Sequence, residues 1–142
     1  MASTHMTSTH KLAVRVYYED TDAGGVVFFA NYLKFMERGR TEWLRALGVS
    51  QQSLALKERR SFVVSRLDMQ YKSPARLDDL LEITSQVTRL GRASLHFTQF
   101  VNRNGELLGS GNIEIGCIDV DSLKPAAIPP DLYRHLKASI QE

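Results

Sequence analysis

Cysteine is almost absent from this sequence of 142 residues, since Cys117 is the only one. No disulfide can therefore form within the chain, and we expect a reducing compartment, the cytoplasm. No apolar run reaches the roughly 18 residues that a transmembrane helix needs, and the N-terminus has no apolar segment typical of a signal peptide. With 18 basic and 16 acidic residues, the net charge of +2 does not favour a nucleic-acid or membrane partner.

Several catalytic motifs are missing as well. The sequence contains no G-x-S-x-G motif of a serine hydrolase and no G-x-x-x-x-G-K-[ST] phosphate loop. The histidines His5, His10, His96 and His135 are scattered, so the sequence gives no support for a zinc site. We expect no metal and no other cofactor, and we expect Cys117 to be a small buried hydrophobe.

The composition that remains is typical of one soluble domain, with 43% hydrophobic and 24% charged residues. The first six residues, MASTHM, resemble a leader left by an expression vector. We therefore expect residues 1–10 to be a disordered N-terminus and residues 11–142 to form a single domain.

The stretch from Tyr17 to Leu47 organises the rest of the chain. An acidic turn, residues 19–22, leads through Ala23-Gly24-Gly25 into a short apolar segment. From Asn31 onward, apolar residues recur at helical spacing and predict a largely buried helix that Gly48 ends. The apolar face of this helix comprises Tyr32, Phe35, Met36, Gly39 and Trp43, widened by Leu33, Leu44 and Leu47.

The remaining sequence alternates between apolar and polar residues and predicts strands at 11–18, 61–71, 80–90, 93–102 and 106–120. Asn104-Gly105 predicts a tight hairpin, and short helices are expected at 50–58 and 131–140. This order predicts an α+β fold in which an antiparallel sheet of about five strands curls around one long central helix. A second apolar face of the sheet, away from the helix, predicts a homodimer. The apolar residues assigned to this face are Phe62, Val64, Phe97 and Val101.

Asp20 and Asp22 in the acidic turn admit several interpretations. The pair is compatible with a solvated loop, with charges that favour the helix dipole, or with a metal site, although no further ligand stands nearby. The sharper hypothesis is catalytic. A carboxylate beside exposed N–H groups at a helix start can act on a carbonyl group that those N–H groups polarise.

The sequence V-R-V-Y-Y-E-D-T-D-A-G-G-V-V, followed by A-N-Y and M-E-R-G-R-T-E, resembles the YbgC branch of the 4-hydroxybenzoyl-CoA thioesterase family. Further similarity at residues 62–64, 73–79 and 124–125 extends the resemblance over nearly all of residues 14–130. The resemblance implies a hotdog fold, acyl-CoA thioesterase activity, and assembly into a homodimer or a dimer of dimers. It implies no cofactor, because coenzyme A is part of the substrate.

The resemblance also implies roles for individual residues. Asp22 corresponds to the catalytic aspartate, which either attacks the thioester or activates a water molecule, and the backbone N–H of Phe29 polarises the carbonyl. Phe29 replaces a histidine of close relatives, so the backbone donor survives and any role of the histidine side chain does not. Asp20 is expected to position the loop. The implied substrate-binding residues are Gly25, Asn31, Tyr32 and Arg92, the last holding the nucleotide of coenzyme A.

Two alternatives stay open. Glu37 on the helix is a rival catalytic carboxylate, because some hotdog thioesterases place their acid there. The resemblance also links the chain to the Tol-Pal envelope system, so a non-catalytic partner that binds acyl-CoA or acyl carrier protein is the alternative function.

Overall fold

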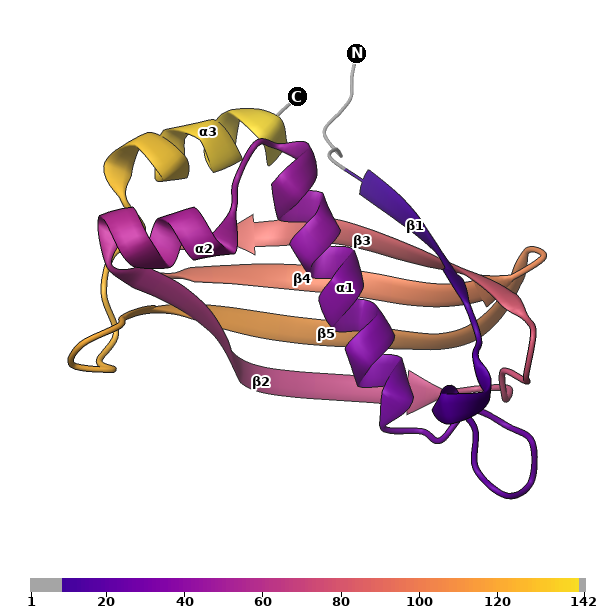
Figure 1. Cartoon of the computed structure of the whole chain (residues 1–142). Helices are drawn as coiled ribbons and strands as arrows, with labels where there is room; N and C mark the ends of the chain where they lie inside the picture. The colour runs from indigo at the N-terminus through magenta and orange to yellow at the C-terminus, as the bar shows by residue number, and fades with distance from the viewer. Residues whose placement is uncertain (1–8, 141–142) are drawn as a thin grey trace, which may run out of the picture.

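The computed structural model describes residues 9–140, which form one antiparallel sheet and a few helices (Figure 1). Of the stretch 1–10 that was predicted to be disordered, residues 1–8 lie outside the described residues, whereas Thr9 and His10 belong to the first strand, so the prediction is wrong for these two. The strands are β1 (Thr9–Arg15), β2 (Arg60–Tyr71), β3 (Leu80–Leu90), β4 (Ser94–Arg103) and β5 (Glu106–Asp119). The helices are a short 3-10 turn (Tyr18–Asp20), α1 (Asn31–Ala46), α2 (Gln51–Ser53) continued by a π-helical turn (Leu54–Glu58), and α3 (Pro130–Ile140).

The five strands pair in the order β1-β3-β4-β5-β2, and every pairing is antiparallel. The predicted hairpin between β4 and β5 is confirmed, since Asn104 and Gly105 have φ angles of 50° and 83°. Positive φ at both central residues is what the tightest hairpin turns need, and Asn and Gly tolerate it best. The antiparallel sheet of about five strands is therefore confirmed.

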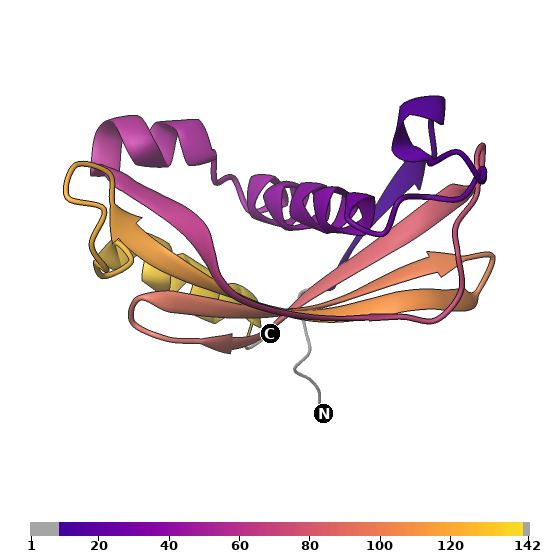
Figure 2. The same cartoon turned by 90° about the horizontal axis from the view of Figure 1, so that it is seen from below.

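Helix α1 lies along the concave side of the curved sheet (Figure 2). The predicted apolar face of α1 is buried, with Phe35 and Met36 fully inaccessible and Trp43 packed edge-on against Phe97 of β4. Gly39 brings the helix close to the sheet, since an added Cβ atom would lie 2.7 Å from Ser85 Oγ. Next to Gly39, the buried Gln99 side chain donates hydrogen bonds to Met36 O and to Ser85 Oγ, both at 2.8 Å. The polar groups at this close contact are therefore hydrogen-bonded.

The assignment of a second apolar sheet face is wrong. A bulge interrupts the pairing of β2 with β5 between Val64 and Arg66, and it reverses the alternation of faces along β2. Phe62 and Val64 lie on the helix-facing side, where they line a cavity with Arg40 of α1. Phe97 and Val101 are buried in the core beneath α1.

The exposed apolar surface lies instead along strand β2, at one edge of the sheet. Val64, Leu67 and Tyr71 are 40–50% exposed, with values of 49%, 42% and 44%. Phe28 and Phe29, just before α1, extend this surface. An apolar edge strand with unpaired backbone groups is a surface that natural proteins usually cover.

The expected short helices are present as α2 with its π-helical turn and as α3, so α1 is the long helix but is not the only one among residues 9–140. Helix α3 packs near the C-terminal end of α1, where His135 Nε2 lies 2.7 Å from Leu47 O. The predicted N-cap of the second helix is present, since Ser53 N donates to Ser50 Oγ. Cys117 is buried as expected, and burial raises the pKa of its thiol. Within residues 9–140, no helix is long and apolar enough to cross a membrane.

Candidate active site

The acidic loop folds back on itself as a small ladder. Asp22 N donates to Val26 O at 2.9 Å, Phe28 N donates to Asp20 O at 3.1 Å, and Thr21 pairs with Val27 between them. Gly25 at the tip has φ +79°, in the left-handed region that glycine adopts most easily. The ladder sets the Asp22 side of the loop against the segment that leads into Phe29 and α1.

Asp22 is exposed at this ladder, and its Oδ1 accepts a hydrogen bond from Gly24 N at 2.8 Å. An added Cβ atom on Gly24 would lie only 3.3 Å from the same Oδ1. The contact orients the Asp22 carboxylate while leaving Oδ2 without a hydrogen-bond partner among residues 9–140. An oriented, accessible carboxylate is the form in which a nucleophile or a general base is useful.

Asp20 has a different environment, because only 6% of it is exposed. Its Oδ2 accepts from Tyr17 N at 2.8 Å and its Oδ1 accepts from Asn31 Nδ2 at 2.7 Å. Asn31 is the first residue of α1, so Asp20 links the start of the acidic loop, at Tyr17, to the start of the helix. The expected positioning role of Asp20 agrees with these contacts.

The start of α1 offers free backbone donors. Asn31 N bonds to Phe28 O and Tyr32 N bonds to Phe29 O, but neither Phe29 N nor Ala30 N has an acceptor within residues 9–140. No side chain caps this helix. Unpaired N–H groups at a helix start, together with the positive end of the helix dipole, favour a developing negative charge.

The loop between β2 and β3, residues 72–79, is hydrogen-bonded to the acidic loop and to the start of α1. Val27 N donates to Ala75 O at 2.8 Å, and Ala75 N donates to the hydroxyl of the buried Tyr32 at 2.9 Å. Arg103 Nη1 contacts Asp79 Oδ2 at 2.7 Å. Burial alone would raise the pKa of Asp79, but hydrogen bonds from Arg103 and from the Arg76 N–H hold that pKa below its usual value. The S-P-A-R-L-D-D segment therefore has a structural function next to the site.

A cavity of about 270 Å³ opens beside Phe29. Sequence reasoning missed most of its lining, although residues 73–79 resemble the same family segment and marked the region. The lining residues are Val27, Phe29, Tyr32, Tyr71, Lys72, Ser73 and Pro74.

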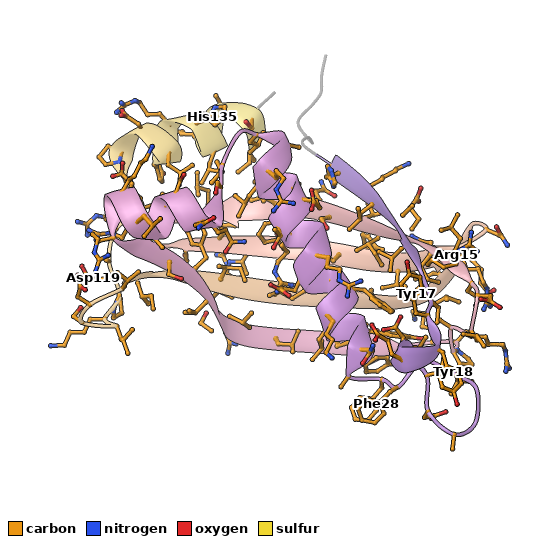
Figure 3. All side chains as sticks on the ribbon, in the orientation of Figure 1. Arg15, Tyr17, Tyr18, Phe28, Asp119 and His135 are labelled. Carbon is orange, nitrogen blue, oxygen red and sulfur yellow. The ribbon has the colours of Figure 1, made fainter. Side chains whose placement is uncertain are left out.

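Arg92 does not join these residues within one chain. It lines a separate cavity of about 630 Å³ together with Arg60 and Arg134. That cavity lies at the end of the sheet marked by Asp119 in Figure 3, whereas Tyr18 and Phe28 of the acidic loop region mark the other end. The ten residues of β4 run between the two ends, a length of about 30 Å.

Glu37, the rival carboxylate, lies further along α1. It lines a cavity of about 180 Å³ between α1, α2 and the sheet, together with Arg40, Phe62 and Val64. Its neighbour Arg40 donates to Gln99 Oε1 at 3.0 Å, and burial lowers the pKa of Arg40 while Glu37 raises it. Glu37 is therefore next to a half-buried cation and is not next to the free N–H groups of Phe29 and Ala30.

The sequence also matches known proteins. Residues 24–110 match the sequence profile described as the thioesterase superfamily. The chain belongs to the thioesterase superfamily. The acyl-CoA thioester hydrolase YbgC of Escherichia coli O6:H1 is 46% identical over 92% of this chain and 98% of its own length, and the acyl-CoA thioesterase YbgC of Haemophilus influenzae is 44% identical over 87% and 93%.

Among solved structures, a probable thioesterase from Bartonella henselae superposes with a TM-score of 0.81 at 36% identity, covering 85% of this chain and 99% of that one. The sheet and α1 are thus those of a hotdog thioesterase. The superfamily profile begins at Gly24, so it includes Phe29 and α1 but not Asp22. In residues 9–140 no group of three or more His, Cys, Asp or Glu residues is arranged to hold a metal ion.

Proposed function

We propose that this protein hydrolyses acyl-CoA thioesters to the free acid and coenzyme A, with Asp22 as the catalytic carboxylate. One observation carries the proposal: the exposed, oriented carboxylate of Asp22 and the free N–H of Phe29 flank the same short ladder at the start of α1. The thioesterase relatives, two of them named as acting on acyl-CoA, support the same substrate class.

In the proposed mechanism, the thioester carbonyl oxygen accepts a hydrogen bond from Phe29 N–H at the positive end of the helix dipole. Negative charge grows on that oxygen as the carbonyl carbon becomes tetrahedral, so a donor already in place stabilises the transition state more than the ground state. The replacement of a histidine of close relatives by Phe29 leaves this donor intact, because the donor belongs to the backbone.

Asp22 has two possible roles, and both complete the reaction. As a nucleophile, a carboxylate oxygen bonds to the carbonyl carbon, the C–S bond breaks, and coenzyme A leaves as the thiolate; water then hydrolyses the mixed anhydride and restores the carboxylate. As a general base, Asp22 takes a proton from a water molecule that attacks the same carbon, and that proton passes to the departing thiolate.

The proposal includes a homodimer formed through β2. Antiparallel pairing of β2 with β2 of a second copy would cover Val64, Leu67 and the unpaired strand edge. It would also bring the Arg60 end of one copy next to the Tyr71 end of the other. Since Arg92 shares a cavity with Arg60, and Tyr71 lies beside Phe29, Arg92 of a second copy would be the one to hold the nucleotide of coenzyme A.

Substrate contacts in the proposal come from groups with different tasks. Phe29 and Tyr32 line the cavity of about 270 Å³, where the acyl group would lie next to the polarised carbonyl. Gly25 lets the loop turn beside Asp22, and Asn31 fixes the loop through Asp20. No contact in residues 9–140 favours acyl carrier protein or an envelope complex over coenzyme A thioesters, so the binding alternative is left to the experiment.

The testing experiment is Asp22→Asn, assayed on a panel of acyl-CoA thioesters by detection of the free thiol. The substitution keeps the side-chain size and removes the charge, so turnover should fall by at least about 10²–10⁴-fold while acyl-CoA affinity, measured by calorimetry, holds. Glu37→Gln is the matched control and should stay near wild-type turnover.

Near-wild-type turnover in a folded Asp22→Asn protein would remove Asp22 from the mechanism, and a loss in Glu37→Gln alone would move the role to Glu37. Binding without turnover in the wild-type protein would favour the binding alternative. A single turnover in H₂¹⁸O, followed by mass spectrometry of the protein, tests the anhydride route, because only attack of water on the Asp22 carbonyl of the mixed anhydride places ¹⁸O in the Asp22 carboxylate.

A further inference from the structure

Tyr71, the last residue of β2, is joined to the start of α1 by its hydroxyl group. The hydroxyl donates to the carbonyl oxygen of Phe29 at 3.0 Å. Its ring lies edge-on to the Phe29 ring at 5.9 Å and 5.2 Å from the ring of Tyr32. The aromatic contacts hold the ring in place, and the hydroxyl then fixes one peptide group of the helix start.

That peptide group is the one between Phe29 and Ala30. Its carbonyl oxygen also accepts from Tyr32 N at 3.2 Å, so two donors hold it. A trans peptide is planar, with its C=O and N–H pointing in opposite directions, so fixing Phe29 O also fixes the direction of Ala30 N–H. Ala30 N–H, like Phe29 N–H, has no acceptor within residues 9–140.

We infer that Tyr71 is a positioning residue, which holds the Phe29–Ala30 peptide so that Ala30 N–H acts with Phe29 N–H as a pair of donors to the substrate carbonyl. The inference rests on the proposed function and adds to it a second donor and the side chain that aims it. A hydrogen bond accepted by Phe29 O also polarises its peptide and strengthens Ala30 N–H as a donor.

The protonation state of Tyr71 agrees with a donor role. Burial raises the pKa of Tyr71, and the neighbouring Tyr32 raises it further, so the hydroxyl keeps its proton at neutral pH.

Tyr71→Phe tests the inference, because it removes only the hydroxyl and keeps both ring contacts. We expect kcat to fall about tenfold, less than the 10²–10³-fold that removal of a donor itself costs, with KM and melting temperature nearly unchanged. Tyr18→Phe is the matched control, since Tyr18 is 82% exposed and lies near the same loop, and it should keep wild-type kcat.

The decisive measurement is the carbonyl stretch of the bound thioester. In the Asp22→Asn background, the carbonyl stretch of a bound ¹³C-labelled acyl-CoA, measured by infrared difference spectroscopy, reports how strongly the donors polarise it. Adding Tyr71→Phe should return the stretch toward its value in free acyl-CoA. Ala30→Pro removes the proposed donor at a φ of −67° that proline can adopt, and it should lower kcat by about 10² or more.

An unchanged kcat together with an unchanged carbonyl stretch in Tyr71→Phe would overturn the inference. So would a loss of kcat matched by a loss of affinity and melting temperature at an unchanged stretch, since that pattern marks a merely structural residue. If Ala30→Pro fails to fold, the spectroscopic comparison of Tyr71→Phe still decides. The proposed function fails separately, when Asp22→Asn keeps its turnover.

Discussion

The carboxylate of Asp20 accepts a hydrogen bond from the side-chain amide of Asn31 at 2.7 Å, and this contact ties the acidic loop to the first residue of α1. Asp22, two residues further along, has no such tie to the helix and remains exposed. Two carboxylates that look alike in the sequence therefore have different surroundings: Asp20 is buried and hydrogen-bonded to the helix start, and Asp22 is exposed.

The first prediction compares the contributions of the two carboxylates to stability. Asp20→Asn should lower the melting temperature more than Asp22→Asn, because Asp20 is buried and accepts two hydrogen bonds. Hydrogen bonds to a charged group contribute about 1.5–3 kcal/mol, whereas a loop charge near a helix start contributes only about 0.3–1 kcal/mol. Turnover should show the opposite order, with the larger loss in Asp22→Asn. Equal melting temperatures for the two variants would contradict the assignment.

The second prediction concerns assembly. The protein should sediment as a species of at least twice its 16.0 kDa chain mass at micromolar concentration. Leu67→Asp places a charge in the exposed apolar row of β2 and should shift the protein toward the monomer. Leu123→Asp is the control, because Leu123 is even more exposed, at 69%, but lies in the turn after β5. A wild-type monomer, or equal effects of both substitutions, would count against β2 as the interface.

A third prediction concerns the acyl group. Phe28 and Phe29, 47% and 61% exposed, present aromatic surface beside the cavity of about 270 Å³. We expect a preference for apolar over charged acyl groups, since each buried methylene contributes about 0.8 kcal/mol. Hexanoyl-CoA should therefore have a higher kcat/KM than succinyl-CoA, and Phe29→Ser should narrow the difference. Equal kcat/KM values for the two thioesters in the wild-type protein would show the prediction to be wrong.

The fourth prediction is a pH dependence of stability. The pKa of Asp79 in the folded protein lies below its usual value, so folding favours the ionised form. The resulting stability is present above the pKa of an unfolded aspartate, about 3.9, and is lost as the pH falls through the lower folded pKa. Melting temperature measured against pH should fall below about pH 4, and Asp79→Asn should flatten that decline.

Asp131→Asn supplies the matched comparison for this acid effect. Asp131 also pairs with an arginine, Arg134, but its side chain is 94% exposed, so solvent screens the pair. The acid-side slope of this variant should stay that of the wild-type protein. A slope that changes as much in Asp131→Asn as in Asp79→Asn would argue against the Arg103–Asp79 contact as its source.

The fifth prediction tests the contact between α1 and the sheet. Gly39→Ala improves helix propensity by about 1 kcal/mol, but the new methyl group would meet Ser85 Oγ at 2.7 Å and Ile83 Cγ2 at 2.9 Å. Overpacking of a core costs about 1–3 kcal/mol, so the variant should unfold at a lower denaturant concentration than the wild-type protein. Gly39→Ala together with Ser85→Ala should recover part of the loss. A more stable single variant would mean that α1 shifts freely on the sheet.

Much of this architecture was predictable because it rests on local patterns. The spacing of Tyr32, Phe35 and Met36 fixes which side of α1 is buried, and Asn104-Gly105 fixes a turn, each through interactions within a few residues. The position of the acidic loop next to a helix start was predictable for the same reason, since Asp22 lies only a few residues before α1. The catalytic role of Asp22 stays a prediction.

Other features were decided only when distant segments met. The bulge between Val64 and Arg66 arises from pairing β2 with β5, and it overturned the face assignment of Phe62 and Val64 because alternation alone cannot register an extra residue. The same holds for Tyr71, whose hydroxyl reaches Phe29 O across 42 positions of sequence, and for Arg92, which the sheet carries to the end away from Asp22. The sequence by itself determined the helix, the strands and the acidic character of the loop before α1, since neighbouring residues carry that information. The tertiary structure decided which residues share a face, a cavity or a hydrogen bond, since those depend on strand register and on the close packing of α1 against the sheet.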